Sequence, residues 1–188
     1  MEKGKIIYLN GVAGAGKTTL SRKLQEHLSV PFYWLSFDSF LNASPERYLK
    51  NQNKEARTIM NKSASLLPHI VKLFSDNGIN VIADGIYLEI DNLLNGCVEL
   101  LYEYPVMFVH VTCPLEELYR RATEERGIVN PEKNIHWQLS ELIPKDIGIY
   151  DLTVDTTKVD CVDKIIQALE YPDKFTAFKT LYEQQHTE

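Results

Sequence analysis

The chain has few cysteines, no long apolar run and no excess of basic residues. Its three cysteines, Cys97, Cys113 and Cys161, are odd in number and far apart, which argues against a disulfide framework and a zinc site and favours a reducing compartment. No stretch approaches the roughly 18 apolar residues that a membrane span needs, and the N-terminus lacks the apolar core of a signal peptide. We therefore expect a cytoplasmic protein that has no membrane partner.

The charge balance is acidic, with 20 Lys and Arg against 26 Asp and Glu and a net charge of −6. Nucleic-acid binders gather Lys and Arg on one surface, so we expect no nucleic-acid partner and favour an enzyme that acts on a small molecule. A chain of 188 residues with 44% hydrophobic and 24% charged residues is expected to form one domain over residues 1–188. A homo-oligomer of that domain stays open.

One glycine-rich motif stands out in residues 11–18, which match G-x-x-x-x-G-K-[ST] between an apolar run and a helix-forming stretch. In such a loop, glycines turn backbone N–H groups toward phosphate oxygens, Lys17 supplies positive charge to the β and γ phosphates, and the Thr18 hydroxyl can bind Mg²⁺. The alternative is a glycine-rich turn that matches by chance. We expect ATP to be held by the loop and the residue after it: Gly11, Val12, Ala13, Gly14, Ala15, Gly16, Lys17, Thr18 and Thr19.

Apolar runs alternate with helical stretches, which is typical of an α/β fold with a parallel sheet covered by helices on both faces. The pattern predicts five strands, at residues 5–10, 32–37, 79–84, 105–112 and 151–155. It predicts helices at about 17–29, 54–77, 91–102, 114–126 and 159–169, and a last amphipathic helix at about 172–185. Because proline lacks an N–H and clashes with the preceding turn, Pro68 predicts that the second helix is kinked or split.

Two carboxylates follow apolar strands, Asp38 after the second and Asp84 at the end of the third. Ligands of open α/β sheets bind at the carboxyl ends of the strands, so both carboxylates should share the cleft of the glycine-rich loop. We expect Asp38 to orient an acceptor hydroxyl and take its proton, and Asp84 to hold Mg²⁺ together with Thr18. The alternatives are a helix cap at Asp38 and a strand-ending turn at Asp84.

Three arginines, Arg120, Arg121 and Arg126, lie on the predicted helix at 114–126. Adjacent helical residues point about 100° apart, so we expect one of Arg120 and Arg121 to face nucleotide and the other solvent. Guanidinium groups stabilise a transferring phosphoryl group, which makes Arg121 and Arg126 candidate catalytic residues and Arg120 a candidate nucleotide ligand. The alternative is a solvated helix with the ion pairs Glu117–Arg121 and Glu116–Arg120.

The polar residues 127–148 contain Pro131, Pro144 and Gly148 around a short helical pattern at 132–142, and they predict a lid. A closing lid excludes the water that would otherwise take the phosphoryl group. His136, Trp137 and Lys145 are its candidates for contact with substrate, and a packed surface helix is the alternative.

These segments together resemble the chloramphenicol phosphotransferase-like family of P-loop kinases, over about residues 1–170. The likeness is carried by residues 11–18, 34–40, 81–88, 109–116, 120–127 and above all 150–157. The resemblance implies a P-loop kinase fold, Asp38 as general base toward a drug hydroxyl, and Thr156 and Thr157 beside adenine. Family members often carry a second lid arginine after Arg126-Gly127, and this chain does not, so either Arg126 acts alone or Lys133 takes the place of the second arginine. Residues 39–66 show no likeness, so the acceptor is not carried over.

The sequence thus predicts a Mg²⁺- and ATP-dependent O-phosphotransferase for a small hydroxylated substrate, with catalytic residues Lys17, Asp38, Arg121 and Arg126. Whether it would inactivate an antibiotic or serve metabolism stays open. One alternative is a kinase for a nucleotide sugar, a nucleoside or a sugar acid. Another is a nucleotide-dependent switch or assembly ATPase without an acceptor, although the guanine signature Asn-Lys-x-Asp is missing.

Overall fold

One parallel sheet of five strands forms the centre of the computed structural model, which describes residues 2–43, 45, 54–89 and 92–187. The strand order is β2-β3-β1-β4-β5. Each strand lies within one residue of its predicted bounds at either end, so the predicted α/β fold with a five-stranded parallel sheet is confirmed. The strands are β1 (Ile6–Asn10), β2 (Phe32–Ser36), β3 (Asn80–Gly85), β4 (Val106–Thr112) and β5 (Leu152–Asp155).

Strand β1 is the middle strand and is buried along its whole length. Its Leu9 is in register with Asp84 of β3 on one side and with Val109 of β4 on the other. The glycine-rich loop therefore leaves the sheet at its centre, between the carboxyl ends of two neighbouring strands, which is where open α/β sheets bind ligands.

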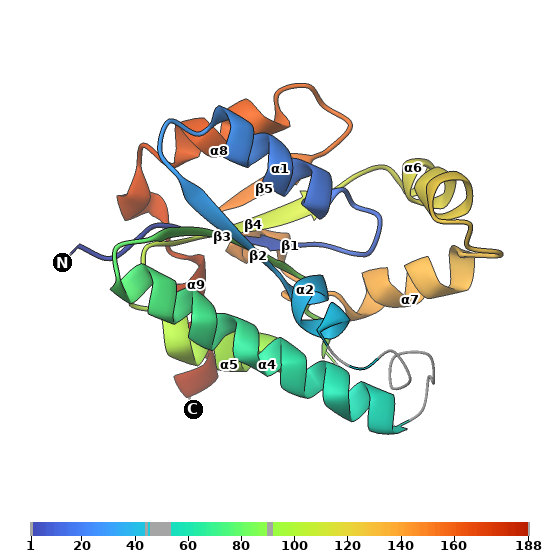
Figure 1. The fold of residues 1–188 in the computed structure, drawn as a ribbon, viewed down its shortest axis with the longest axis horizontal. Coiled ribbons are helices and arrows are strands. Elements are labelled where there is room, and N and C mark those ends of the chain that lie inside the picture. Colours follow the sequence, from blue (N-terminus) through green and yellow to red (C-terminus); the bar gives the residue numbers. More distant parts are fainter. Residues whose placement is uncertain (1, 44, 46–53, 90–91, 188) are drawn as a thin grey trace.

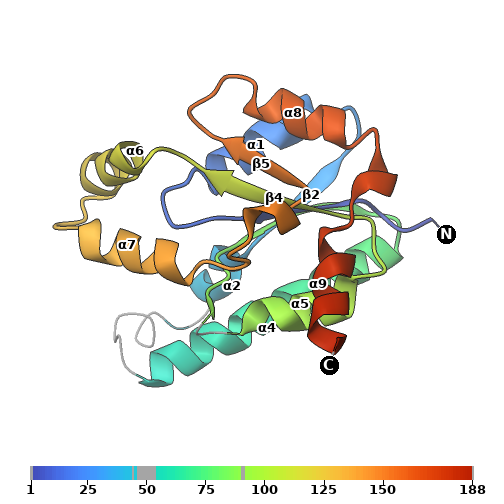
Figure 2. The ribbon, with the colours of Figure 1, turned by 180° about the vertical axis from the view of Figure 1, so that it is seen from behind.

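Helices cover both faces of the sheet (Figure 1). One face carries α1 (Lys17–His27) and α8 (Cys161–Ala168), and the other carries α4 (Lys54–Asp76), α5 (Leu93–Leu101) and α9 (Ala177–His186). Figure 2 shows α9 beside α5 from behind. The helices α2 (Phe37–Asn42), α6 (Leu115–Arg120) and α7 (Glu132–Glu141) lie near the carboxyl ends of the strands. None of the helices described here is both long and apolar enough to cross a membrane.

Three helix predictions need correction. Pro68 does not split α4, which is one helix from Lys54 to Asp76, and Leu67 and Val71 on either side of the proline are buried against the sheet. The predicted helix at 114–126 changes after Arg120 into a π-helical stretch, η2 (Arg121–Glu125). The last helix begins at Ala177 and not at 172, because the chain forms a short 3-10 turn, η4 (Pro172–Lys174), and is extended at Phe175.

The C-terminal helix is fastened to the sheet by the Asp151 carboxylate. Its Oδ1 accepts hydrogen bonds from the backbone nitrogens of Thr176 (2.7 Å) and Ala177 (3.0 Å), and its Oδ2 accepts from the nitrogen of Phe108 in β4 (2.8 Å). These bonds satisfy donors at the start of α9, which would otherwise lack partners. The helix then buries Phe178 and Leu181 against the core.

Candidate active site

The glycine-rich loop has a backbone that other residues would not adopt freely. A Cβ atom on Gly11 would lie 2.2 Å from the carbonyl oxygen of Val111, and Gly14 and Gly16 have φ angles of 86° and 98°. Positive φ angles of this size favour glycine. The backbone nitrogens of Gly14 and Gly16 have no hydrogen-bond partner among the described residues. The loop thus offers free N–H donors in the arrangement that binds phosphate.

Lys17 is half-buried at the end of this loop, and its Nζ donates to the carbonyl oxygens of Gly11 (2.6 Å) and Val12 (3.1 Å). Desolvation lowers the pKa of Lys17 to about 8, although the carboxylates of Asp84 and Asp38 act in the opposite direction. The lysine charge is therefore under-compensated, and a phosphate group that replaced the carbonyls would stabilise it.

Asp84 is a buried carboxylate held by two side chains of β2. Its Oδ2 accepts from Nε1 of Trp34 (2.7 Å) and its Oδ1 accepts from Oγ of Ser36 (2.8 Å). Burial raises the pKa of Asp84, and these hydrogen bonds counteract that rise. Each oxygen keeps a lone pair that can accept from a metal-bound water. Thr18 exposes its side chain to the same cavity, so the donors present fit a Mg²⁺ ion, which prefers oxygen ligands and retains several waters.

Asp38 lies in the first turn of α2, two residues beyond the end of β2. Its backbone nitrogen donates to Oγ of Ser36 (3.2 Å), whereas its exposed carboxylate has no hydrogen-bond partner in the described part of the chain. The side chain therefore makes no capping bond to α2. It is left facing the cavity, where its charge acts on both Lys17 and Asp84.

Arg121 ties its helix to the glycine-rich loop. Its Nε donates to Oε1 of Glu117 (2.7 Å), and its Nη1 donates to the carbonyl oxygen of Gly14 (3.1 Å) and to Oγ1 of Thr156 (3.0 Å). Thr156 in turn donates to the carbonyl oxygen of Ala15 (2.7 Å). Arg121 and Thr156 thus hold the loop between the arginine helix and the end of β5.

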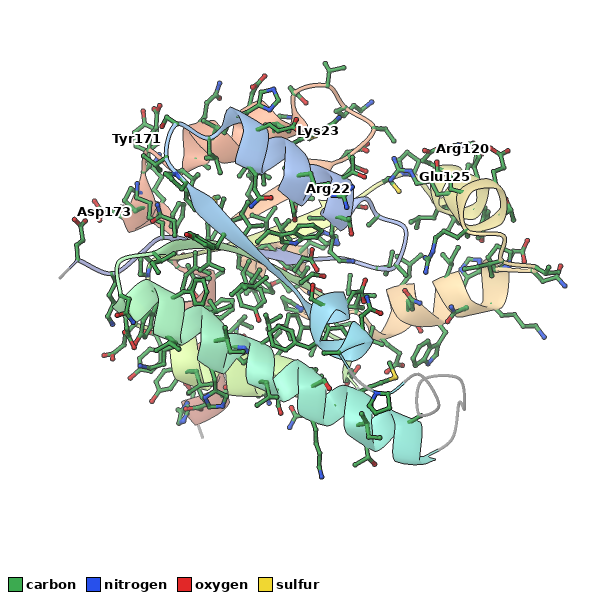
Figure 3. The ribbon with its side chains drawn as sticks, in the orientation of Figure 1. Arg22, Lys23, Arg120, Glu125, Tyr171 and Asp173 are labelled. Atoms are coloured by element: carbon green, nitrogen blue, oxygen red, sulfur yellow. The ribbon has the colours of Figure 1, made fainter. Side chains whose placement is uncertain are left out.

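Arg120 points away from this contact, into a group of glutamates. It forms ion pairs with Glu117 (2.8 Å), Glu124 (3.0 Å) and Glu125 (2.9 Å), and Figure 3 shows Arg120 and Glu125 together at the outer end of the molecule. The alternative pair Glu116–Arg120 is replaced by Glu117, which serves both arginines. Hydrogen bonds from Arg120 and then Arg121 lower the pKa of Glu117 to about 2.

A cavity of about 690 Å³ joins these groups at the carboxyl ends of the strands. Nine predicted residues with polar or charged side chains line it: Lys17, Thr18, Thr19, Asp38, Asp84, Arg120, Arg121, Arg126 and Thr156. Ala13, Gly14 and Gly16 line it as well, whereas the loop residues Gly11, Val12 and Ala15 are buried and do not line it. The apolar side chains of its lining are Leu20, Phe37, Met60 and Ile86. Part of the predicted acceptor segment 39–66, namely residues 44 and 46–53, lies outside the described residues.

Several residues predicted to contact nucleotide or substrate have their side chains outside the cavity. Thr157 bonds Oδ1 of Asp155 and is not among the described residues that line the cavity. His136 shares a hydrogen bond with Tyr119 (2.7 Å), and Lys145 pairs with Glu89 (3.2 Å). Neither of these two residues, nor Lys133 or Trp137, is among the described residues that line the cavity. Lys133, His136 and Trp137 are exposed because α7 buries Ile135 and Gln138 on its other side. Lys145 lies beyond the end of α7 and turns to Glu89.

Sequence reasoning missed four residues that hold the site in place. Trp34 and Ser36 hold Asp84, Gln138 accepts a hydrogen bond from the loop nitrogen of Ala13, and Asn10, just before the loop, donates to the carbonyl oxygen of Ile143. Trp34 and Ser36 belong to the segment 34–40, which carries part of the family resemblance. Only the register of β2 with β3 brings their side chains to Asp84. Gln138 follows the apolar Ile135 by three positions, so the helical period places both on the same, buried side of α7. That spacing is the one signal in the sequence.

The comparisons with known proteins agree with this geometry. Residues 4–170 match the chloramphenicol phosphotransferase-like protein family. The chain belongs to this family. It is therefore an O-phosphotransferase of the P-loop kinase class. The family match ends at residue 170, so α9 lies beyond it.

Individual relatives extend over most of the chain. A Mycobacterium tuberculosis protein that carries the provisional name O-phosphotransferase is 26% identical and covers 95% of this chain and 89% of its own length. The structure of M. tuberculosis APS kinase in complex with AMPPNP and APS has a TM-score of 0.65 at 18% identity, covering 93% of this chain and 99% of that one. Shikimate kinase from Acinetobacter baumannii, in complex with shikimate, gives 0.63 at 20% identity, covering 90% and 93%. The two structures establish the P-loop kinase fold.

Proposed function

We propose that this chain is an ATP- and Mg²⁺-dependent O-phosphotransferase that moves the γ-phosphate of ATP to a hydroxyl of a small molecule, as chloramphenicol 3-O-phosphotransferase does. The observation that carries the proposal is the meeting of Lys17, Asp38 and Asp84 in one cavity. Phosphoryl transfer from a nucleotide to an alcohol requires a cation and carboxylates in one place. Here they are Lys17, the Asp38 carboxylate, which has no hydrogen-bond partner among the described residues, and the buried Asp84 carboxylate.

The free N–H groups of Gly14 and Gly16 and the Lys17 ammonium would hold the β and γ phosphates and stabilise the charge that develops during transfer. Thr18 and Asp84 would hold Mg²⁺, which when bound neutralises phosphate charge. Arg126 is exposed on the cavity and would meet the transferring group, whereas Arg121 would act from its place against the loop.

Asp38 would accept the proton of the acceptor hydroxyl while that oxygen forms its bond to the γ-phosphorus. The bond between this phosphorus and the bridging oxygen breaks, and ADP leaves with that oxygen. The apolar side chains of Phe37, Met60 and Ile86 beside Asp38 would pack against the carbon skeleton of the acceptor and keep water from the reacting oxygen. Segment 127–148 is proposed to act as the lid over this reaction.

The test is a panel of hydroxyl acceptors, which should include amphenicols, nucleosides, nucleotide sugars and sugar acids, assayed with ATP and Mg²⁺. We expect acceptor-dependent phosphorylation, with slow ATP hydrolysis when no acceptor is present. Transfer only to a nucleotide sugar or sugar acid would contradict the drug-like acceptor. Turnover that no acceptor stimulates would favour a switch ATPase.

The role of Asp38 is tested by Asp38→Asn, with Ser39→Ala on the neighbouring exposed residue as the control. Loss of a general base lowers the rate by about 10²- to 10⁴-fold. We expect that loss in kcat for Asp38→Asn together with an ATP dissociation constant within about twofold of the wild type, since the loop contacts stay in place. Full transfer activity in Asp38→Asn would refute the mechanism.

A further inference from the structure

Gln138 is a buried amide side chain on α7, a helix whose other residues are mostly exposed. Only 9% of Gln138 is exposed, and a buried amide is costly unless it is hydrogen-bonded. Its Oε1 accepts a hydrogen bond of 2.8 Å from the backbone nitrogen of Ala13, 125 positions away in the sequence. The segment 127–148 is therefore in direct polar contact with the glycine-rich loop.

The same segment is fixed a second time, at the residue that precedes the loop. Asn10 is fully buried at the end of β1, where its Oδ1 accepts from the nitrogen of Tyr87 (3.0 Å). Its Nδ2 donates to the carbonyl oxygen of Ile143 (2.7 Å) and to the hydroxyl of Tyr150 (2.7 Å). Ile143 also donates its N–H to the carbonyl of Tyr87 (3.0 Å). The chain just after α7 is thus held against the strand that carries the loop.

Asn10 and Gln138 act on different parts of the loop. Asn10 fixes its base, whereas Gln138 binds the amide immediately before Gly14, whose left-handed backbone presents a free N–H to the cavity. Within the described residues, Gln138 makes the one hydrogen bond between α7 and residues 11–18. Two other polar side-chain contacts join α7 to its surroundings in the described part of the chain: His136 bonds Tyr119, and Lys145 donates to the carbonyl oxygen of Ser140. Both are exposed, and neither involves the loop.

We propose that Gln138 is a positioning residue that couples α7 to the glycine-rich loop. A movement of α7 would change the hold on the Ala13 amide and so reorient the peptide that precedes the free Gly14 N–H. In return, binding of a phosphate at the loop would change the position of α7 through the same hydrogen bond. The inference rests on the proposed function only in placing a nucleotide phosphate at the loop.

The test uses Trp137, the neighbour of Gln138 and one of only two tryptophans in the chain. Protein labelled with 5-fluorotryptophan gives two ¹⁹F resonances, and Trp137→Phe identifies which belongs to α7. We expect AMPPNP to shift the Trp137 resonance in the wild type. In Gln138→Met, which removes the acceptor but keeps the side-chain length, we expect the shift to vanish and the AMPPNP dissociation constant to rise about tenfold.

Leu139→Met is the matched control, because it places the same new side chain on the adjacent, exposed position of α7. It should keep both the ¹⁹F shift and the wild-type affinity. A Trp137 resonance that responds in Gln138→Met as it does in the wild type would overturn the proposal. So would a dissociation constant for Gln138→Met within twofold of that for Leu139→Met.

A second measurement needs no variant. In nucleotide-free wild-type protein, the Ala13 amide should exchange its hydrogen at least tenfold more slowly than the amide of Gly14, since only the first has a partner among the residues that the structure describes. Equally fast exchange at both amides would contradict the bond to Gln138, whether or not Gln138→Met folds. Neither measurement uses an acceptor. A chain that phosphorylated nothing would refute the proposed function and leave this coupling to be judged by its own data.

Discussion

The indole nitrogen of Trp34 donates a 2.7 Å hydrogen bond to Oδ2 of Asp84 and so fixes the plane of a buried carboxylate at the end of β3. Ser36, two residues further along β2, holds the other oxygen. Two side chains on the same face of β2 thus hold one carboxylate, and that carboxylate lines the cavity. The segment 34–40, which resembles the family, therefore contains Asp38 and also the two donors that orient Asp84.

Replacing Trp34 by Phe removes the donor to Asp84 and part of the packing around it. We expect the free energy of unfolding to fall by about 1–3 kcal/mol, because a buried charged acceptor loses a partner. Under the proposed function, the Mg²⁺ concentration for half-maximal activity should also rise about tenfold, as is usual when a group that orients a metal ligand is removed. Denaturant titration and a Mg²⁺ titration of activity measure the two effects. Tyr33→Phe, on the exposed neighbour, should change neither.

Glu117 binds both Arg120 and Arg121, and its pKa is lowered from 4.5 to about 2. A carboxylate whose pKa is lower in the folded state stabilises the fold above its unfolded pKa and loses that contribution as the pH falls toward its folded pKa. We expect Glu117→Gln to have a lower melting temperature than the wild type at pH 6, and the gap to close between about pH 4.5 and pH 2. Glu116→Gln removes an equal charge from the same helix and serves as the control. A gap that stays constant down to pH 2 would exclude the ion pairs as its cause.

Gly11 and Gly96 should respond in opposite ways to alanine. A Cβ on Gly11 would lie 2.2 Å from a backbone oxygen, so Gly11→Ala should destabilise the fold by about 3 kcal/mol or more. Gly96 is exposed inside α5, and a Cβ there meets nothing within 4 Å, so Gly96→Ala should stabilise by about 0.5–1 kcal/mol through helix propensity. Denaturant unfolding of both variants decides. Equal effects would show that the Val111 contact does not constrain Gly11.

Asp151 should control the attachment of α9. Asn at this position keeps one acceptor but places an NH₂ group where the other oxygen now accepts, so Asp151→Asn should cost about 1–3 kcal/mol. Hydrogen exchange at Thr176 and Ala177 should accelerate more than exchange in β1. Asp173→Asn, an exposed change in η4 (labelled in Figure 3), is the control and should leave both amides protected. Unchanged exchange in Asp151→Asn would mean that packing of Phe178 and Leu181 alone holds the helix.

The sheet could be predicted from the sequence because each strand is a short apolar run bounded by turn or cap residues. The ends of α4 and η2 could be predicted as well, since Gly78 and Gly127, both at positive φ, follow them. Two features could not be predicted from the sequence. One is that α4 continues through Pro68, which depends on tertiary packing. The other is the start of α9, which is set by the extended backbone at Phe175.

Within the candidate site, the loop and both carboxylates were found from local patterns. The links that hold them were not, because Trp34–Asp84, Arg121–Thr156 and Ala13–Gln138 join residues 50, 35 and 125 positions apart. No spacing rule encodes such pairs; they depend on strand register and on how α7 lies against the loop.

The place of β1 in the sheet also bears on how the protein is made. This strand is translated before β3 and β4, with which it pairs, and Gly11 rests against Val111 of β4. The nucleotide cradle therefore cannot take its shape until residue 112 has left the ribosome. The segment that would bind ATP is thus translated before the strands that complete it, and in nascent protein the apolar residues of β1 stay exposed to water or to a chaperone until β3 and β4 follow.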